Sequence, residues 1–317
     1  MTAVTRGRRA AQPSIALPLW LRGKPGQKAR RQPLTPRDAR WWVGVICVAL
    51  SVTLLGFVGH VTLFGALQEA NSQQAEYGAL RQTLALATTP TGQLDLNHRL
   101  VADGTPIAVL SIPKLGLKQV IAQGTTSQVL RSGPGHRADS VLPGQAGTSV
   151  VFGRQSTYGG PFGGLAALVP GDTIKVMTGQ GTSTFTVLGL RRPGDLLPET
   201  LAANQGRLEL VTADGPILAP SGTLYVDASL KGTAKPTPRQ VLGVQALEDG
   251  SSPMQSDPNA LLPFLFSLQW LIVAVALTRW LLARWGRWQT WIICFPVILV
   301  LAATTADAAM GLLPNLL

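Results

Sequence analysis

Apolar residues are spaced in three ways along the chain. Long apolar runs cover about 41–65, 261–277 and 288–306, each near the roughly 20 residues that a membrane-spanning helix needs. After the first run, Leu80, Leu84 and Ala87 recur at helical spacing. Short apolar runs punctuated by Gly and Pro then predict β-strands at 107–112, 118–122, 149–152, 173–177, 183–190, 207–212 and 223–228. The pattern predicts a mainly β domain, either a barrel or a sandwich, with three transmembrane α-helices.

These patterns divide the chain into consecutive segments with different environments. We expect a basic disordered cytoplasmic tail (1–40), a first transmembrane helix (41–66), a membrane-proximal helix (67–92), the β domain (93–229), a linker rich in Pro and Gly (230–258), a second transmembrane helix (259–283), and a third that leads to an exterior C-terminus (284–317).

The net charge of +11 is concentrated beside the apolar runs. Residues 1–40 hold ten Lys or Arg and a single acid, and Arg279, Arg284 and Arg287 lie between the last two runs. Because Lys and Arg near span ends stay cytoplasmic, we expect a plasma-membrane protein with a cytoplasmic N-terminus and an extracytoplasmic β domain and C-terminus. The basic tail is expected to attract anionic membrane lipids. Charge placed in this way disfavours nucleic acid as a partner.

The cysteine count restricts the chemistry outside the membrane. Cys47 and Cys294 are the two cysteines of the chain, and both lie in predicted spans. The β domain therefore has no thiol and no disulfide. Its His, Asp and Glu residues show no metal-ligand spacing, and its Gly-rich segments are not phosphate-binding loops, so we expect no metal and no cofactor.

Several motifs in the β domain resemble, in order, those of the sortase family. They are 112–117 (Ile-Pro-Lys-Leu-Gly-Leu), 133–136 (Gly-Pro-Gly-His), 157–162 (Thr-Tyr-Gly-Gly-Pro-Phe), 170–176, 208–212 and 224–228. The Thr-Tyr-Gly stretch is similar to the actinobacterial, class E-like type. The resemblance implies an eight-stranded β-barrel and a Gram-positive actinobacterial source.

The same resemblance implies cysteine transpeptidase chemistry, in which a thiolate attacks, a histidine protonates the leaving amine and an arginine stabilises the oxyanion. At the matching positions this chain has Ala213 for the cysteine, Arg154 for the histidine and Thr223 for the arginine. An arginine does not release a proton near neutral pH. We therefore expect a catalytically inactive pseudo-sortase that is not an enzyme and has no catalytic residue.

A groove without chemistry can still bind. We expect the groove to be lined by Arg154, Tyr158, Phe162, Thr212 and Asp214, and to hold an extended peptide segment. The predicted function is that of a binding or scaffolding subunit of a cell-surface assembly, whose partners are other membrane or cell-surface proteins.

Two alternatives remain open. The first is a transpeptidase or hydrolase with a rearranged site that uses a hydroxyl of Thr212, Ser156, Thr157, Ser221 or Thr223, with Asp214 as a base beside Thr212. His98 and His136 are expected to be surface or turn-packing residues rather than bases. The second alternative is a purely structural membrane subunit with a closed groove, held by spans that pack together or dock onto another membrane protein.

Overall fold

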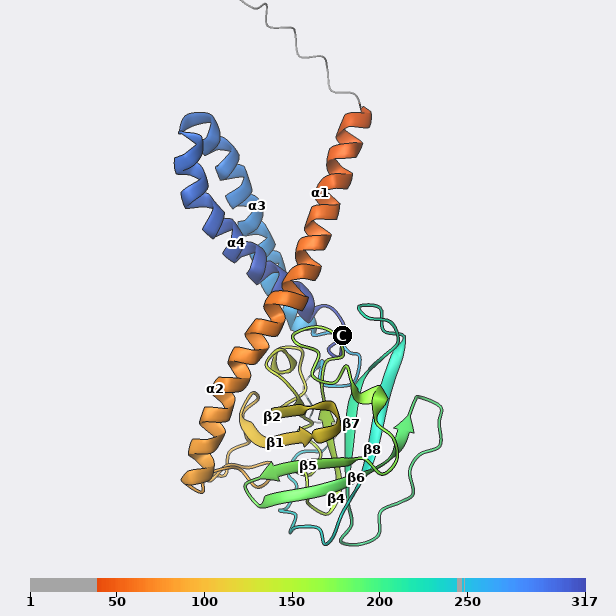
Figure 1. The fold of residues 1–317 in the computed structure, drawn as a ribbon. Coiled ribbons are helices and arrows are strands. Elements are labelled where there is room, and N and C mark those ends of the chain that lie inside the picture. Colours follow the sequence, from red (N-terminus) through yellow and green to blue (C-terminus); the bar gives the residue numbers. More distant parts are fainter. Residues whose placement is uncertain (1–38, 244–246, 248) are drawn as a thin grey trace, which may run out of the picture. The chain divides into compact units, whose positions relative to one another are not determined.

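The β domain is a closed barrel whose strands follow the order β1-β2-β3-β4-β7-β8-β6-β5 (Figure 1). The expectation of an eight-stranded sortase-like barrel is confirmed. The pairs β2–β3 and β4–β7 are parallel, and the other pairs are antiparallel. The strands are β1 Pro106–Ile112, β2 Leu117–Gln123, β3 Gly135–His136, β4 Gly147–Phe152, β5 Thr173–Thr178, β6 Gly181–Arg191, β7 Gly206–Asp214 and β8 Gly222–Leu230.

Alternation along the strands gives the barrel an inner core and an outer layer. On β7, Leu208 and Leu210 lie in the main core, whereas Val211 and Ala213 belong to a separate cluster. On β4, Val151 faces the main core, and its neighbours Val150 and Phe152 belong to the separate cluster. Because residues on both faces of β4 and β7 are buried, the outer face of these strands must be covered by residues from outside the barrel.

The computed structural model describes residues 39–243, 247 and 249–317. Contacts divide the chain into two compact units, one that ends at Ser51 and one of residues 52–317. The predicted cytoplasmic tail, with its lipid-binding role, lies almost entirely outside the described residues, and both remain predictions.

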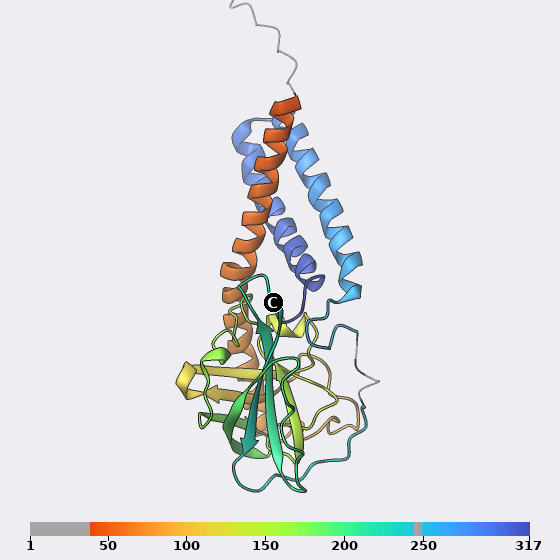
Figure 2. The same cartoon turned by 90° about the vertical axis from the view of Figure 1, so that its right-hand side faces the viewer.

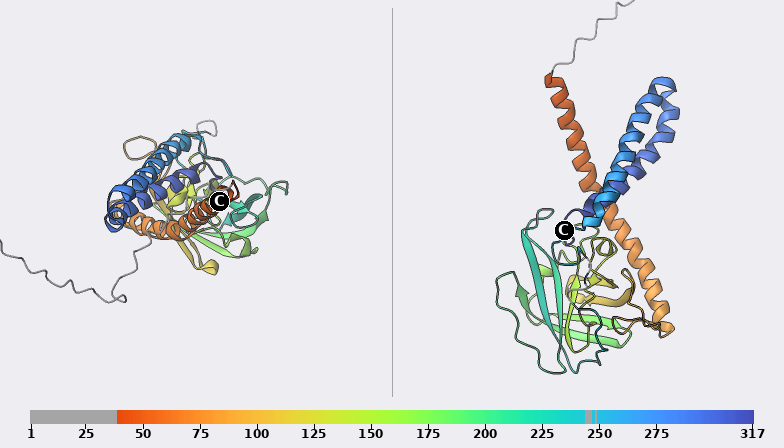
Figure 3. Two further views of the ribbon diagram at one scale, coloured as in Figure 1. Left: turned by 90° about the horizontal axis from the view of Figure 1, so that it is seen from above. Right: turned by 180° about the vertical axis from the view of Figure 1, so that it is seen from behind.

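The first span and the membrane-proximal helix are continuous. Helix α1 (Ala39–Gly59) passes through a π-helical turn (His60–Phe64) into α2 (Gly65–Ala85). Leu80 of α2 is buried with Val109 and Val120 of β1 and β2, and α2 runs beside the barrel (Figure 3). Leu80 thus covers part of the outer face of strands β1 and β2.

Helices α3 (Leu261–Arg284) and α4 (Arg287–Gly311) lie side by side (Figure 2). Together with the helix that begins at Ala39, they make three helices that are long and apolar enough to cross a membrane, as the sequence predicted. Their orientation across a membrane stays a prediction. Four short 3-10 helices complete the described elements: Pro113–Leu115, Val129–Arg131, Leu165–Ala167 and Pro258–Ala260.

The segment that precedes α3 and the segment that follows α4 lie against each other. Asp257 N–H donates to the Gly311 carbonyl at 2.8 Å, and Asn315 N–H donates to the Gln255 carbonyl at 2.9 Å. Earlier in the expected linker, Lys235 N–H donates to the Gly144 carbonyl at 2.8 Å. The linker is therefore hydrogen-bonded to the barrel and to the end of α4.

The backbone of Gly135 on β3 lies close to that of Gly124, and substitution of Gly135 tests this contact. A Cβ on Gly135 would overlap the Gly124 carbonyl oxygen, whereas a Cβ on Gly189 of β6 meets nothing within 4 Å. We expect Gly135→Ala to reduce the free energy of unfolding by about 2 kcal/mol or more, and Gly189→Ala to change it by less than about 0.5 kcal/mol. Thermal unfolding of the full chain in detergent measures both. Equal midpoints for the two variants would contradict the described approach of β3 to residue 124.

Candidate functional site

Positions 154, 213 and 223, which the motif resemblance matched to sortase catalytic residues, meet at one end of the barrel. Phe152 of β4 and Val211 of β7 are partners in a parallel ladder, so Arg154 and Ala213, each two residues further along, leave the sheet in the same direction. Ala213 is directly opposite Thr223 of β8 in the antiparallel ladder. Opposed residues on neighbouring strands share a face and have Cβ atoms about 5 Å apart. The topology therefore brings the three substituted positions together.

An apolar side chain from outside the barrel fills this end. Leu316 is fully buried in the cluster that contains Ala213, and the residues that surround it are called the Leu316 site below. They are Leu130, Val150, Phe152, Val211 and Ala213. Because Ala213 ends at a methyl group, the sheet leaves room here for a leucine.

Arg154 lies next to this site with no exposed surface. Its Nε donates to the Leu130 carbonyl at 3.1 Å, and its Nη2 donates to the Ser127 carbonyl at 2.9 Å and the Ser127 hydroxyl at 2.8 Å. Its Nη1 donates to Thr157 Oγ1 at 3.2 Å. Burial lowers the pKa of Arg154 to about 9, although the nearby Tyr158 acts in the opposite direction. The guanidinium fork therefore holds the loop between β2 and β3, and it leaves no surface for a ligand to reach.

Tyr158 connects this region to the helices. Its hydroxyl donates to Asp307 Oδ1 at 2.6 Å, and His60 Nε2 lies 3.0 Å from the same oxygen. Arg131 donates to the Asp307 carbonyl. Burial, together with the hydrogen bond to Asp307, raises the pKa of Tyr158. His60 and Asp307 are thus paired with each other, and Asp307 is also hydrogen-bonded to the barrel domain.

The structure separates the residues that were expected to line a groove. Phe162 is buried in the main core. Thr212 lies on the strand face opposite to Ala213, and its buried hydroxyl has no hydrogen-bond partner among the described residues. Asp214 is partly exposed and accepts from Arg192 Nε at 2.7 Å. Arg154 and Tyr158 do lie together, with the guanidinium 5.1 Å from the ring centre, but neither is exposed.

Sequence reasoning missed the residues that occupy the site. Leu316 and Asn315 follow the last helix, about a hundred positions after Ala213, and the earlier expectation assigned them only to an exterior terminus. A signal was present, since Leu312, Leu313, Leu316 and Leu317 are apolar beyond the end of the span. Four exposed leucines outside a membrane are unfavourable, so a binding surface on the barrel was to be expected.

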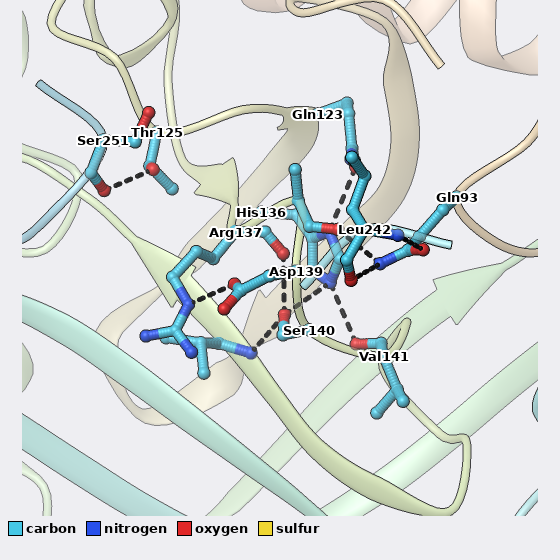
Figure 4. A network of polar contacts seen from close by, with 12 residues as sticks. Gln93, Gln123, Thr125, His136, Arg137, Asp139, Ser140, Val141, Leu242 and Ser251 are labelled. Carbon is cyan, nitrogen blue, oxygen red and sulfur yellow. Dashed lines mark hydrogen bonds and ion pairs between the residues drawn. The ribbon is translucent and has the colours of Figure 1, made fainter. Parts of the chain in front are cut away.

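His136 was expected to be a surface or turn-packing residue, but it is buried on strand β3 in a separate polar network (Figure 4). Its Nδ1 is 3.0 Å from Gln123 Oε1, and its Nε2 is 2.9 Å from the Val141 carbonyl oxygen and 3.0 Å from Ser140 Oγ. Burial lowers the pKa of His136 to about 4. The imidazole is therefore neutral at physiological pH and fixes the loop between β3 and β4, away from Ala213.

Thiols and metal-ligand clusters are not found near Ala213 in the part of the chain that the structure describes. Cys47 lies in α1 and Cys294 in α4, and no group of three or more His, Cys, Asp or Glu side chains among the described residues is arranged to hold a metal ion.

Comparison with known proteins identifies what the barrel resembles. Residues 110–230 match the sortase domain family. Sortase D of Bacillus subtilis (strain 168) is 29% identical over 85 residues, which are 27% of this chain and 41% of that protein. The match thus spans less than half of the relative.

Among solved structures, sortase E from Streptomyces avermitilis is 29% identical to this chain. The match covers 42% of this chain and 92% of that structure, and has a TM-score of 0.36. A Clostridium perfringens sortase D5 transpeptidase is 20% identical, covers 51% and 99%, and has a TM-score of 0.42. The chain is sortase-like.

The expectation that this chain is not an enzyme is wrong. The match of residues 110–230 to the sortase domain and the likeness to Sortase D point to a family of transpeptidase enzymes, and neither comparison marks the chain as inactive. The expectation rested on the side chains at positions 154, 213 and 223 alone. Its physical weakness is that the same end of the barrel carries the hydroxyls of Thr157 and Thr223, and a hydroxyl is also a nucleophile once it is activated.

The buried imidazole gives a pH-dependent prediction. Since the pKa of His136 in the folded chain is about 4, well below its ordinary 6.5, the unfolded chain binds a proton that the folded chain excludes. Stability from this group is therefore complete above about pH 6.5 and is lost as the pH falls towards 4. We expect the thermal midpoint to fall less between pH 6.5 and 5 in His136→Gln than in the wild type. His98→Gln, which changes an exposed histidine, is the control and keeps the wild-type slope. A wild-type slope in His136→Gln would refute the assignment.

The buried guanidinium gives a second prediction. Arg154→Met keeps an unbranched chain of similar length but leaves the Leu130 and Ser127 carbonyls unpaired. We expect a loss of about 3 kcal/mol in the free energy of unfolding. Lys114→Met, which removes a solvent-exposed ion pair with Asp172, is expected to cost less than about 1 kcal/mol. Thermal or denaturant unfolding measures both, and equal losses would mean that Arg154 does not organise the loop.

Proposed function

We propose that this sortase-like protein is held in a cell membrane and binds a peptide segment of a partner at the Leu316 site, as a subunit of a cell-surface assembly. One observation carries the proposal: the site already holds an apolar side chain from a segment outside the barrel. A surface that binds Leu316 has the shape and polarity to bind a similar side chain from another protein.

The chemistry of the site suits peptide recognition. Burial of a leucine side chain is worth roughly 1.5–3 kcal/mol. Beside the pocket, Gln155 N–H donates to the Leu316 carbonyl at 2.9 Å, and Thr157 Oγ1 donates to the Leu317 carbonyl at 2.5 Å. Main-chain hydrogen bonds that flank a side-chain pocket are a common mode of peptide binding. The resident segment is a turn, with Leu317 N–H donating to the Pro314 carbonyl at 3.1 Å, so the ligand need not be extended.

The membrane placement proposed for the chain puts this site on the exterior. The basic loop between α3 and α4 favours a cytoplasmic position by the positive-inside rule. The end of α4 then lies on the same side as the barrel, which agrees with the burial of Leu316 on the barrel. The class E-like, actinobacterial character belongs to the same proposal and rests on the Thr-Tyr-Gly stretch at 157–159.

Peptide transfer at the same site is a second candidate function, favoured by the match to a transpeptidase family. The Thr157 hydroxyl donates to the Leu317 carbonyl oxygen here. In such a transfer its oxygen attacks a carbonyl carbon, the peptide C–N bond breaks, and the hydroxyl proton passes to the leaving amine. An acceptor amine then attacks the ester carbonyl carbon, the ester C–O bond breaks, and a proton of the amine returns to the Thr157 oxygen. Activation of the hydroxyl requires a base, which the partner segment or a rearranged loop has to supply.

Filling the pocket tests the binding function. We expect an extracytoplasmic protein to co-purify with the full chain from native membranes, and Ala213→Phe to reduce its recovery about tenfold, as a loss of about 1.4 kcal/mol predicts. Leu188→Phe, at an exposed position of β6, is the matched control and keeps the recovery of the wild type. Thermal midpoints of both variants exclude unfolding as the cause.

Other outcomes decide against binding at this site. Unchanged recovery with a folded Ala213→Phe chain contradicts the proposal, and recovery that depends only on α3 or α4 supports a purely structural subunit. The same preparations, incubated with fragments of the co-purified protein and an amine acceptor, test transfer. A covalent product in mass spectra that disappears in Thr157→Val establishes the second function.

A further inference from the structure

The segment that fills the Leu316 site is anchored like a bound ligand. It begins directly after α4 and contributes two buried leucines at different places: Leu316 packs with Ala213, and Leu317 packs with Val61 and Tyr158. The segment forms no strand with the barrel. The segment is held on the barrel by the burial of its side chains and by a few hydrogen bonds.

Asn315 supplies the polar anchor of the segment. Its fully buried Nδ2 lies 3.1 Å from the Thr125 carbonyl oxygen and 3.0 Å from those of Gly250 and Ser252. The Asn315 Oδ1 atom is buried and has no hydrogen-bond partner among the described residues. An amide NH₂ has two hydrogens, so the three acceptors are not all satisfied at once. The three carbonyls thus select the NH₂ group of the side chain, and the incomplete pairing allows the anchor to be exchanged.

Arg154 holds the second polar contact in place. Its Nη1 donates to Thr157 Oγ1 at 3.2 Å, and that hydroxyl donates to the Leu317 carbonyl at 2.5 Å. A donor that is itself charged polarises the hydroxyl and strengthens the next hydrogen bond. Arg154 is thus a positioning residue that acts on the segment through Thr157.

Two occupants cannot share the site. The pocket next to Ala213 is filled by Leu316, and the Gln155 N–H and the Thr157 hydroxyl are both engaged by the same segment. A tethered segment competes at an effective concentration on the order of millimolar. Any peptide that binds at the Leu316 site therefore has to displace this segment.

We infer that Pro314–Leu317 is a resident ligand of the Leu316 site, and that the site recognises a partner's turn of the same chemistry: a carboxamide side chain followed by two branched aliphatic ones. This inference rests on the proposed function and adds the class of ligand. The partner's turn replaces the resident one, with its carboxamide at the carbonyls of residues 125, 250 and 252 and its first aliphatic side chain against Ala213.

Release of the resident segment tests the inference. The full chain carrying Asn315→Ala and Leu316→Asp is mixed with a fluorescent peptide of the sequence of residues 312–317, and fluorescence anisotropy in detergent gives the dissociation constant. We expect binding more than about tenfold tighter than to the wild type, whose site is occupied. Leu312→Ser, in the same segment but half-buried, is the matched control and stays like the wild type. The same peptide with Asp in place of the first of its last two leucines binds neither chain.

A second measurement does not depend on release. With Cys47 and Cys294 changed to Ala, the pair Ala213→Cys and Leu316→Cys is expected to form a disulfide that locks the segment, while Leu188→Cys with Leu316→Cys does not. The locked chain loses the co-purifying partner and regains it on reduction. A released chain that keeps its thermal midpoint and does not bind the peptide overturns the inference, as does a locked chain that retains the partner. If the peptide binds but no surface protein co-purifies, the inference stands and the proposed function fails.

Discussion

The buried guanidinium of Arg154 is the interaction on which this end of the barrel depends. A cation removed from water is costly unless its donors are paired. Here the two carbonyls and two hydroxyls around the fork supply that pairing, and the ring of Tyr158 adds its negative face 5.1 Å away. Each partner belongs to a loop rather than to a strand. The cation therefore fixes the backbone between β2 and β3 and the turn after β4, which together shape the Leu316 site.

The same interaction connects the barrel to the helices. Tyr158, held against Arg154, reaches Asp307 of α4, and Asp307 also meets His60 of the first long helix. Asp307 lies one turn before Gly311, where α4 ends and the resident segment begins. A shift of α4 relative to the barrel changes the position of Leu316, because few residues separate the two. Occupancy of the Leu316 site and the packing of the helices are therefore not independent.

Much of the fold follows from the sequence, because local spacing determines it. Short apolar runs punctuated by Gly and Pro located every strand except the two-residue β3, and long apolar runs located the spans. Closure into an eight-stranded barrel came only from the family resemblance, since the parallel β4–β7 pair joins residues about sixty positions apart. The site was predicted less well. Ala213 and Thr223 do meet, but Thr212 faces the inner side of its strand, and Phe162 belongs to the core. Leu316 was missed because no local pattern records a contact between the end of α4 and β7.

Substitution of a catalytic residue and loss of a binding site are different events. The short side chain of Ala213 makes room for a leucine, and Arg154 is a fork that orders two loops. Both residues shape the site that holds Leu316. Bond exchange at this site, as proposed above, requires a base that reaches the Thr157 hydroxyl when a partner is bound. Under the same proposal, recognition of the peptide depends instead on the geometry of the Leu316 site.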